Sequence, residues 1–173
     1  MAKVELLVPH ILKWEGGWAN DPDDLGGATN KGVTFKTYKS YCRIVGKPIP
    51  SIGDLRRLTD DEFTDILKTM YWSACKADFI ESQSVANAVV DWAWNSGVAT
   101  AVKEVQKVLG VKADGIIGNV TLSAINSQSP LSLFGRIQQA RKAYIERICH
   151  ARPANEKFRR GWMNRIQSLQ FED

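Results

Sequence analysis

A glutamate at position 15 is the residue of this sequence best suited to acid–base chemistry. Apolar residues ahead of it recur at steps of three and four: Val4, Leu7, Val8, Ile11 and Leu12. Glu15 continues that stripe, so we expect its carboxyl group on or beside the buried face of a helix. Gly16 and Gly17 would end the helix. Loss of hydration disfavours a charged carboxylate, so Glu15 could hold a proton near neutral pH and donate it.

Three aspartates, Asp21, Asp23 and Asp24, follow in a polar, glycine-rich loop over residues 16–34. Loops of this length inside a compact domain are usually functional. A calcium loop counted from Asp21 would need oxygen ligands where Leu25 and Gly32 stand, so the EF-hand pattern fails. Asp-Pro and Asp-Asp sequences also form turns whose side chains bond only to nearby backbone, and this alternative stays open for each aspartate.

Glycoside hydrolysis is the chemistry that uses one proton-donating carboxyl group and a second, solvated carboxylate. The acid protonates the glycosidic oxygen, and the carboxylate activates water or stabilises the oxocarbenium charge. Glu15 on a helix and an aspartate on the next loop would form such an asymmetric pair. The loop can hold the two groups anywhere from contact to roughly 30 Å apart, so the spacing permits the pair without proving it.

Two of the six tryptophans are candidate sugar-stacking platforms. Trp18 lies in the polar loop outside any helical stripe, and Trp72 lies at the end of an expected helix; both could stack on the apolar face of a saccharide. Asn95 could bond a hydroxyl or acetamido group, although a helix C-cap explains it equally well. Burial is the simpler explanation for the other four: Trp14, Trp92, Trp94 and Trp162.

The composition fits one globular domain, or a domain with a small appendage. The chain has 173 residues, 44% of them hydrophobic, and a net charge of +4 that favours an anionic partner. Its three widely spaced cysteines suggest neither a disulfide framework nor a zinc site, so we expect reduced packing residues and no metal. No run is apolar enough for a secretory signal or a membrane span. We therefore expect synthesis in the cytoplasm without a cleavable export signal, and no stable membrane insertion. Because the sequence has no nucleic-acid-binding motif, we expect no nucleic-acid partner.

Helical periodicity recurs along the chain and strand signals are scarce, so we expect an all-α fold with a long loop after the first helix. A capping box at Thr59 and Glu62 begins one helix. The other expected helices cover residues 35–45, 85–97, 102–110 and 130–148, with a last amphipathic piece around residues 158–169. We divide the chain into a catalytic region at residues 1–84 and a helical region at residues 85–173, packed into the same fold.

The segment WEGGWANDPDDLGGATNKGVT resembles the signature of the glycoside hydrolase family 108 muramidases, found in phage endolysins and related lysozyme-like proteins. The resemblance implies a lysozyme-like helical fold, with Glu15 as the general acid. A weaker similarity to phage-type lysozymes points to Asp24 as the second carboxylate and Thr29 as a residue that helps to place water, with inversion at the anomeric carbon. Asp21 and Asp23 remain alternatives, as does reliance on the glutamate alone. We expect Asn20 and Thr34, in the same signature, to contact substrate.

The segment VVDWAWNSGVATAVKEVQKVLGVKADGIIGNVTLSAIN is similar to the peptidoglycan-binding region that accompanies this family. It carries the turn Ala113-Asp114-Gly115, which as a structural turn needs no ligand.

Together the two resemblances predict an endolysin-type N-acetylmuramidase. It would cleave the β-1,4 bond between N-acetylmuramic acid and N-acetylglucosamine in peptidoglycan glycan strands, without a cofactor, after release to the cell wall. A chitinase- or chitosanase-like hydrolase and a non-catalytic peptidoglycan-binding or secretion-assisting protein are the alternatives. The sequence leaves the oligomeric state open.

Overall fold

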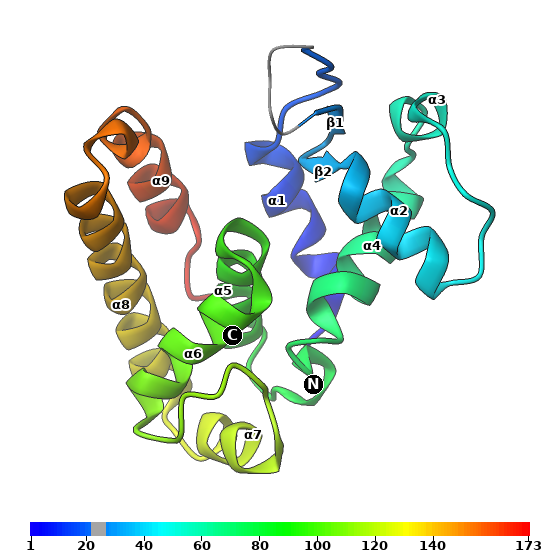
Figure 1. The fold of residues 1–173 in the computed structure, drawn as a ribbon. Helices are drawn as coiled ribbons and strands as arrows, with labels where there is room; N and C mark the ends of the chain where they lie inside the picture. Colours follow the sequence, from blue (N-terminus) through cyan, green and yellow to red (C-terminus); the bar gives the residue numbers. More distant parts are fainter. Residues whose placement is uncertain (22–26) are drawn as a thin grey trace. The chain divides into compact units, whose positions relative to one another are not determined.

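The computed structural model describes residues 1–21 and 27–173 and is mainly helical, as the sequence predicted (Figure 1). The chain forms two compact units. The N-terminal unit is Val4–Met70, and the C-terminal unit is Met1–Lys3 together with Tyr71–Asp173. In the part of the chain that the structure describes, no helix is long and apolar enough to cross a membrane.

The N-terminal unit combines short helices with one small hairpin. Its elements are a 3-10 turn (Val4–Leu6), α1 (Val8–Trp14), β1 (Thr29–Asn30), β2 (Val33–Thr34), α2 (Phe35–Ile44), α3 (Ile52–Arg56) and α4 (Asp60–Leu67). A π-helical turn (Lys68–Trp72) continues α4 across the boundary between the units at residues 70 and 71. Leu7 and Ile11, from the predicted stripe, have no exposed surface. The first predicted helix is divided, because the regular helix begins only at Val8, with Pro9 in its first turn.

Side-chain N-caps also start α3 and α4. The Thr59 hydroxyl accepts a hydrogen bond from the Glu62 N–H at 3.2 Å, as predicted, but the Glu62 carboxylate accepts from the Tyr38 hydroxyl at 3.1 Å. The capping box expected at Thr59 is therefore only half formed. A complete box begins α3, where the Ser51 and Asp54 side chains each accept from the other's backbone N–H, at 3.2 and 2.8 Å.

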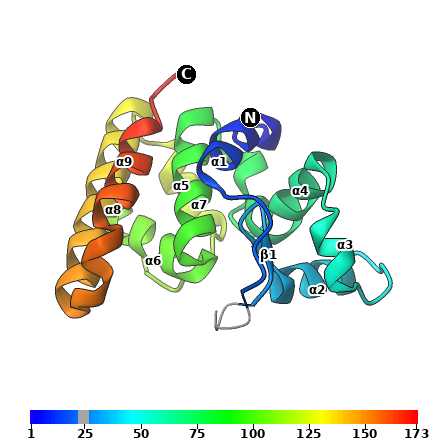
Figure 2. The ribbon, with the colours of Figure 1, turned by 90° about the horizontal axis from the view of Figure 1, so that it is seen from above.

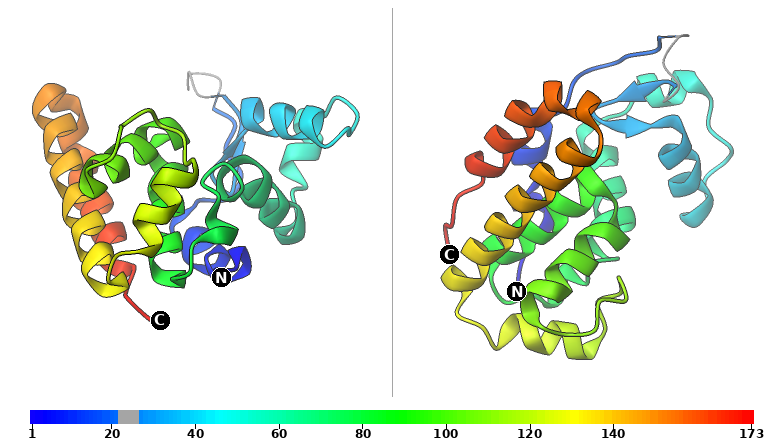
Figure 3. Two further views of the ribbon diagram at one scale, coloured as in Figure 1. Left: turned by 90° about the horizontal axis from the view of Figure 1, so that it is seen from below. Right: turned by 60° about the vertical axis from the view of Figure 1, so that its left-hand side comes forward.

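The C-terminal unit is a helical assembly around α5 (Gln83–Ser96). Its other elements are a 3-10 turn (Ala77–Phe79), α6 (Val98–Leu109), α7 (Asn119–Asn126), α8 (Pro130–Ala151), a 3-10 turn (Pro153–Asn155) and α9 (Glu156–Ser168). Figures 2 and 3 show α8 and α9 side by side, with α8 next to α5. The predicted apolar positions Val85, Val89 and Trp92 are buried, so α5 forms the core of this unit.

The turn at Asp114 and Gly115 is held by the buried side chain of Gln106. The Gln106 carbonyl oxygen accepts from the Gly115 N–H at 2.8 Å, and its amide nitrogen donates to Asp114 Oδ1 at 2.9 Å and to Thr121 Oγ1 at 3.1 Å. Gly115 has φ 83°, the left-handed region that favours glycine. These bonds give the Asp-Gly sequence a structural role between α6 and α7.

Candidate active site

Glu15 ends α1 and turns the chain out of the helix. Its backbone is extended, with φ −89° and ψ 145°, and its N–H donates to the Ile11 carbonyl at 3.1 Å. Glu15 therefore lies one residue beyond the helix, as its C-cap, and not inside it. Its side chain is half-buried, beside the buried stripe as the sequence predicted.

The turn between β1 and β2 lies directly against the Glu15 side chain. Lys31 (φ 50°) and Gly32 (φ 78°) form a two-residue hairpin loop in which both residues have positive φ. A Cβ atom at position 32 would lie 2.6 Å from Glu15 Cδ and 2.9 Å from its Cγ, and closer still to Oε2. A side chain at position 32 would therefore displace the end of the Glu15 side chain, and glycine leaves the carboxyl group where it lies.

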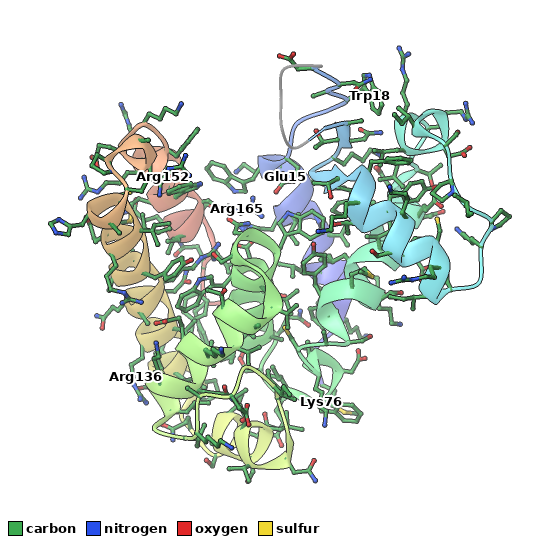
Figure 4. All side chains as sticks on the ribbon, viewed as in Figure 1. Glu15, Trp18, Lys76, Arg136, Arg152 and Arg165 are labelled. Carbon is green, nitrogen blue, oxygen red and sulfur yellow. The ribbon has the colours of Figure 1, made fainter. Side chains whose placement is uncertain are left out.

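The loop that follows Glu15 is also tied to the hairpin. Ala19 and Thr29 exchange backbone hydrogen bonds of 2.9 and 2.8 Å, and Thr29 pairs with Thr34 in the antiparallel register. Trp18, half-buried beside this bridge, has the Arg56 guanidinium 5.8 Å from its ring centroid. Figure 4 labels Glu15 and Trp18 in this region. The structure thus joins α1, the loop and the hairpin into one local assembly.

Two threonines of the predicted site have defined places in that assembly. The Thr34 hydroxyl accepts from the Thr37 N–H at 3.1 Å and so forms the N-cap of α2. Thr29 is half-buried, with its backbone bonded to Ala19. A structural function as a helix cap therefore accounts for Thr34 without any substrate.

The predicted acidic partner falls in the part of the loop that the structure leaves undescribed. Asp23 and Asp24 lie outside the described residues, whereas Asp21 and Asn20 are described and exposed. The identity of the second carboxylate therefore stays a prediction.

Asn30 is a positioning residue that sequence reasoning did not single out. Its buried side-chain amide donates to the carbonyl oxygens of Leu55 and Arg56, at 2.9 and 3.0 Å. These carbonyls belong to the last residues of α3, so Asn30 attaches the hairpin to that helix. Lys31, next to it, forms an ion pair with Asp60. No local pattern signals these bonds, because the partners lie 25 residues or more along the chain.

The C-terminal unit carries the two remaining predicted site residues. Trp72 is fully buried, and its indole N–H donates to Asp78 Oδ1 at 2.8 Å. This corrects the expectation that Trp72 stacks on a sugar, because a ring without exposed surface offers no face. Asn95 lies on α5 with its side-chain oxygen 3.3 Å from Arg141 Nη2. Arg141 in turn bonds the buried Asp91 carboxylate at 2.7 Å.

The described residues hold no group of three or more histidine, cysteine or acidic side chains that could bind a metal ion. All three cysteines are free and buried, and burial raises the pKa of the Cys75 thiol to about 12. They therefore act as packing residues.

The fold is that of a mainly helical, lysozyme-like protein, and in it a glutamate lies against a short hairpin. Comparison with known proteins identifies the class. The family Glycosyl hydrolase 108 matches residues 8–97, and the family described as Predicted Peptidoglycan domain matches residues 100–167. The structure of SagA from Brucella abortus matches with a TM-score of 0.78 and 32% sequence identity, over 96% of this chain and 90% of that one. No match was found among the curated proteins.

The chain therefore belongs to glycosyl hydrolase family 108, as the resemblance of its N-terminal signature predicted. It is a glycoside hydrolase that acts on peptidoglycan, and the match over residues 100–167 gives it a peptidoglycan-binding region.

Proposed function

We propose that the protein is an N-acetylmuramidase. It cleaves the β-1,4 bond between N-acetylmuramic acid and N-acetylglucosamine, with Glu15 as the general acid. The observation that carries this proposal is the contact of the Glu15 carboxyl group with Gly32, because a proton donor must be held in one place relative to the glycosidic oxygen. Half-burial also shields the group from bulk water.

The remaining roles follow the chemistry of glycoside hydrolysis. Asp24, with Asp21 and Asp23 as alternatives, supplies the second carboxylate that activates water or stabilises developing positive charge. Thr29 helps to place that water, and Trp18 offers an aromatic face to a sugar ring. Asn20, Thr34 and Asn95 remain candidate polar contacts. The net charge of +4 suits an anionic wall polymer.

We further propose that the enzyme reaches the wall as a lysin released from the cytoplasm, as in phage lysis. Expression in a bacterial host tests this role. We expect lysis only when a membrane pore is co-expressed, and lysis without the pore would contradict the proposed route.

Fragment analysis tests the bond that is cleaved. Purified protein is incubated with peptidoglycan sacculi, the products are reduced with borohydride, and the fragments are analysed by mass spectrometry. A muramidase gives reduced N-acetylmuramic acid at the new ends. Reduced N-acetylglucosamine, 1,6-anhydro ends or intact glycan strands would each contradict the proposed cleavage. Chitin oligomers incubated in parallel are expected to remain intact.

A further inference from the structure

A groove outside the candidate site lies at the end of α2 in the N-terminal unit. It has a volume of about 590 Å³, within the range of ligand-binding pockets. One wall is the last part of α2, and the other is the loop towards α3, drawn in cyan in Figure 1. Cys42 contributes a neutral floor, because burial raises the pKa of its thiol.

The loop wall is apolar and largely uncovered. Pro48, Ile49 and Pro50 form it, and the Ile49 side chain is 93% exposed. Ile44 and Val45, at the end of α2, are also exposed. Neighbouring exposed apolar side chains of this kind mark interaction surfaces, whereas single ones are ordinary.

The helix wall is basic. Lys39, Arg43 and Lys47 line the groove. Lys47 is neutralised by Glu62, 2.9 Å away. Among residues 1–21 and 27–173, Arg43 has no ion pair, and the ammonium group of Lys39 contacts only the Phe35 ring, 4.8 Å from its centroid. Two positive charges thus stand beside an apolar surface without a carboxylate partner, which favours a ligand that brings its own carboxylates.

We propose that this groove binds an acidic peptide that contains small apolar residues. Lys39 and Arg43 can each pair with one carboxylate of the ligand. The wall of Pro48, Ile49 and Pro50 can pack against short aliphatic side chains between those carboxylates. A concave groove suits a peptide segment better than a flat lipid surface. The peptide stems of peptidoglycan have this chemistry, and their choice as the source rests on the proposed function.

The distance along α2 is compatible with one substrate reaching both places. Thr34 joins the hairpin to α2, and Arg43 lies eight residues beyond Phe35, about 12 Å further along the helix axis. An extended stem of four residues spans up to about 14 Å. The length of a stem peptide therefore matches the part of α2 between the hairpin and Arg43.

Titration with a soluble stem peptide tests the proposal without any hydrolysis. The probe is N-acetyl-L-Ala-γ-D-Glu-L-Lys-D-Ala, which keeps a net negative charge because its amino terminus is blocked, and the matched control is the same peptide with both free carboxyl groups amidated. Binding to the 173-residue protein is followed by NMR of backbone amides. We expect saturable shifts at residues 39–50 and about tenfold weaker binding of the amidated peptide, because charge-assisted hydrogen bonds are lost.

Two exposed substitutions locate the binding. Arg43→Gln and Ile49→Ser should each lower the affinity for the acidic peptide several-fold. Lys3→Gln and Leu6→Ser, exposed positions that precede both family matches, remove a like charge and a like apolar surface and should leave the affinity for the peptide unchanged. Because all four side chains are exposed, we expect every variant to fold.

Three outcomes would overturn the proposal: equal affinity for the acidic and amidated peptides, unchanged affinity in both groove variants, or no saturable shift. Vesicles of phosphatidylglycerol and phosphatidylcholine are tested in parallel. Binding to these vesicles, without peptide binding, would assign the surface to a membrane. If the protein binds the peptide but does not cleave sacculi, the peptide-binding groove is supported and the muramidase proposal is contradicted.

Discussion

At the scale of single residues, the orientation of Glu15 depends on the missing side chain of Gly32. Any β-carbon at that position would overlap the glutamate side chain, which must then move. The backbone at position 32 also has φ 78°, where other residues are strained. Gly32 therefore allows the positive φ of the turn and also leaves space for the Glu15 carboxyl group.

Gly32→Ala should displace the carboxyl group and lower peptidoglycan hydrolysis by about 10²-fold, since a shift of about 1 Å can cost that much. It should also lower the free energy of unfolding by about 1–2 kcal/mol. Rates of turbidity loss and urea unfolding curves measure the two effects.

Gly110→Ala is the matched control for Gly32→Ala. Gly110 has a similar φ of 72°, but no atom lies within 4 Å of the point that a β-carbon would occupy there. It should lose comparable stability and keep its activity. Equal hydrolytic activity in the two variants would show that the contact between Gly32 and Glu15 does not affect catalysis.

At the scale of elements, Asn30 joins the hairpin to α3. Asn30→Ala would leave the carbonyl oxygens of Leu55 and Arg56 without this donor, and we expect a loss of about 2 kcal/mol in unfolding free energy. Asn164→Ala, an exposed position on α9, should change stability by less than about 0.5 kcal/mol. Indistinguishable urea midpoints for the two variants would contradict the role given to Asn30.

Gln106 holds the turn between α6 and α7 in the same way. Gln106→Leu preserves the approximate volume but removes the partners of Gly115, Asp114 and Thr121, so we expect a loss of about 2–3 kcal/mol. Gln139→Leu on the exposed face of α8 is the control. A stable Gln106→Leu protein would mean that the turn forms without these bonds.

The helices were predictable because their apolar spacing is a local signal. Val85, Val89 and Trp92 are buried as their rhythm predicts, and Gly110 ends α6 in the left-handed conformation. The hairpin escaped prediction because each of its strands has only two residues, too few to show alternation.

The site was predicted only in part. Glu15 could be placed beside the buried face because its stripe is local. The contact with Gly32 depends on chain folding that no local pattern encodes. Trp72 was misassigned because an aromatic residue at a helix end can be a platform or a core residue, and only its burial distinguishes the two.

At the scale of the whole molecule, carboxylates in both units favour the folded state above acidic pH. Hydrogen bonds from the backbone N–H and hydroxyl of Ser51 lower the pKa of Asp54. Bonds from the Gln106 side chain and the Ile116 N–H lower the pKa of Asp114. A depressed pKa in the folded state contributes stability above the unfolded value, about 3.9 for aspartate, and that stability is lost as pH falls through the folded value.

The melting temperature should therefore fall as pH is lowered from about 5 to about 3. The double variant Asp54→Asn with Asp114→Asn should show a shallower decline over the same range. Differential scanning calorimetry of both proteins measures the slopes. A variant as acid-sensitive as the wild type would show that these two carboxylates do not contribute.

The proposed hydrolysis depends on Glu15 as the proton donor, and Glu15→Gln tests it most directly. The amide preserves the shape of the side chain but cannot donate a proton to the leaving oxygen. The release of muramic acid ends from sacculi should fall by about 10² to 10⁴, while the melting temperature stays within a few degrees of the wild type. Product release at the wild-type rate by the folded variant would contradict this mechanism.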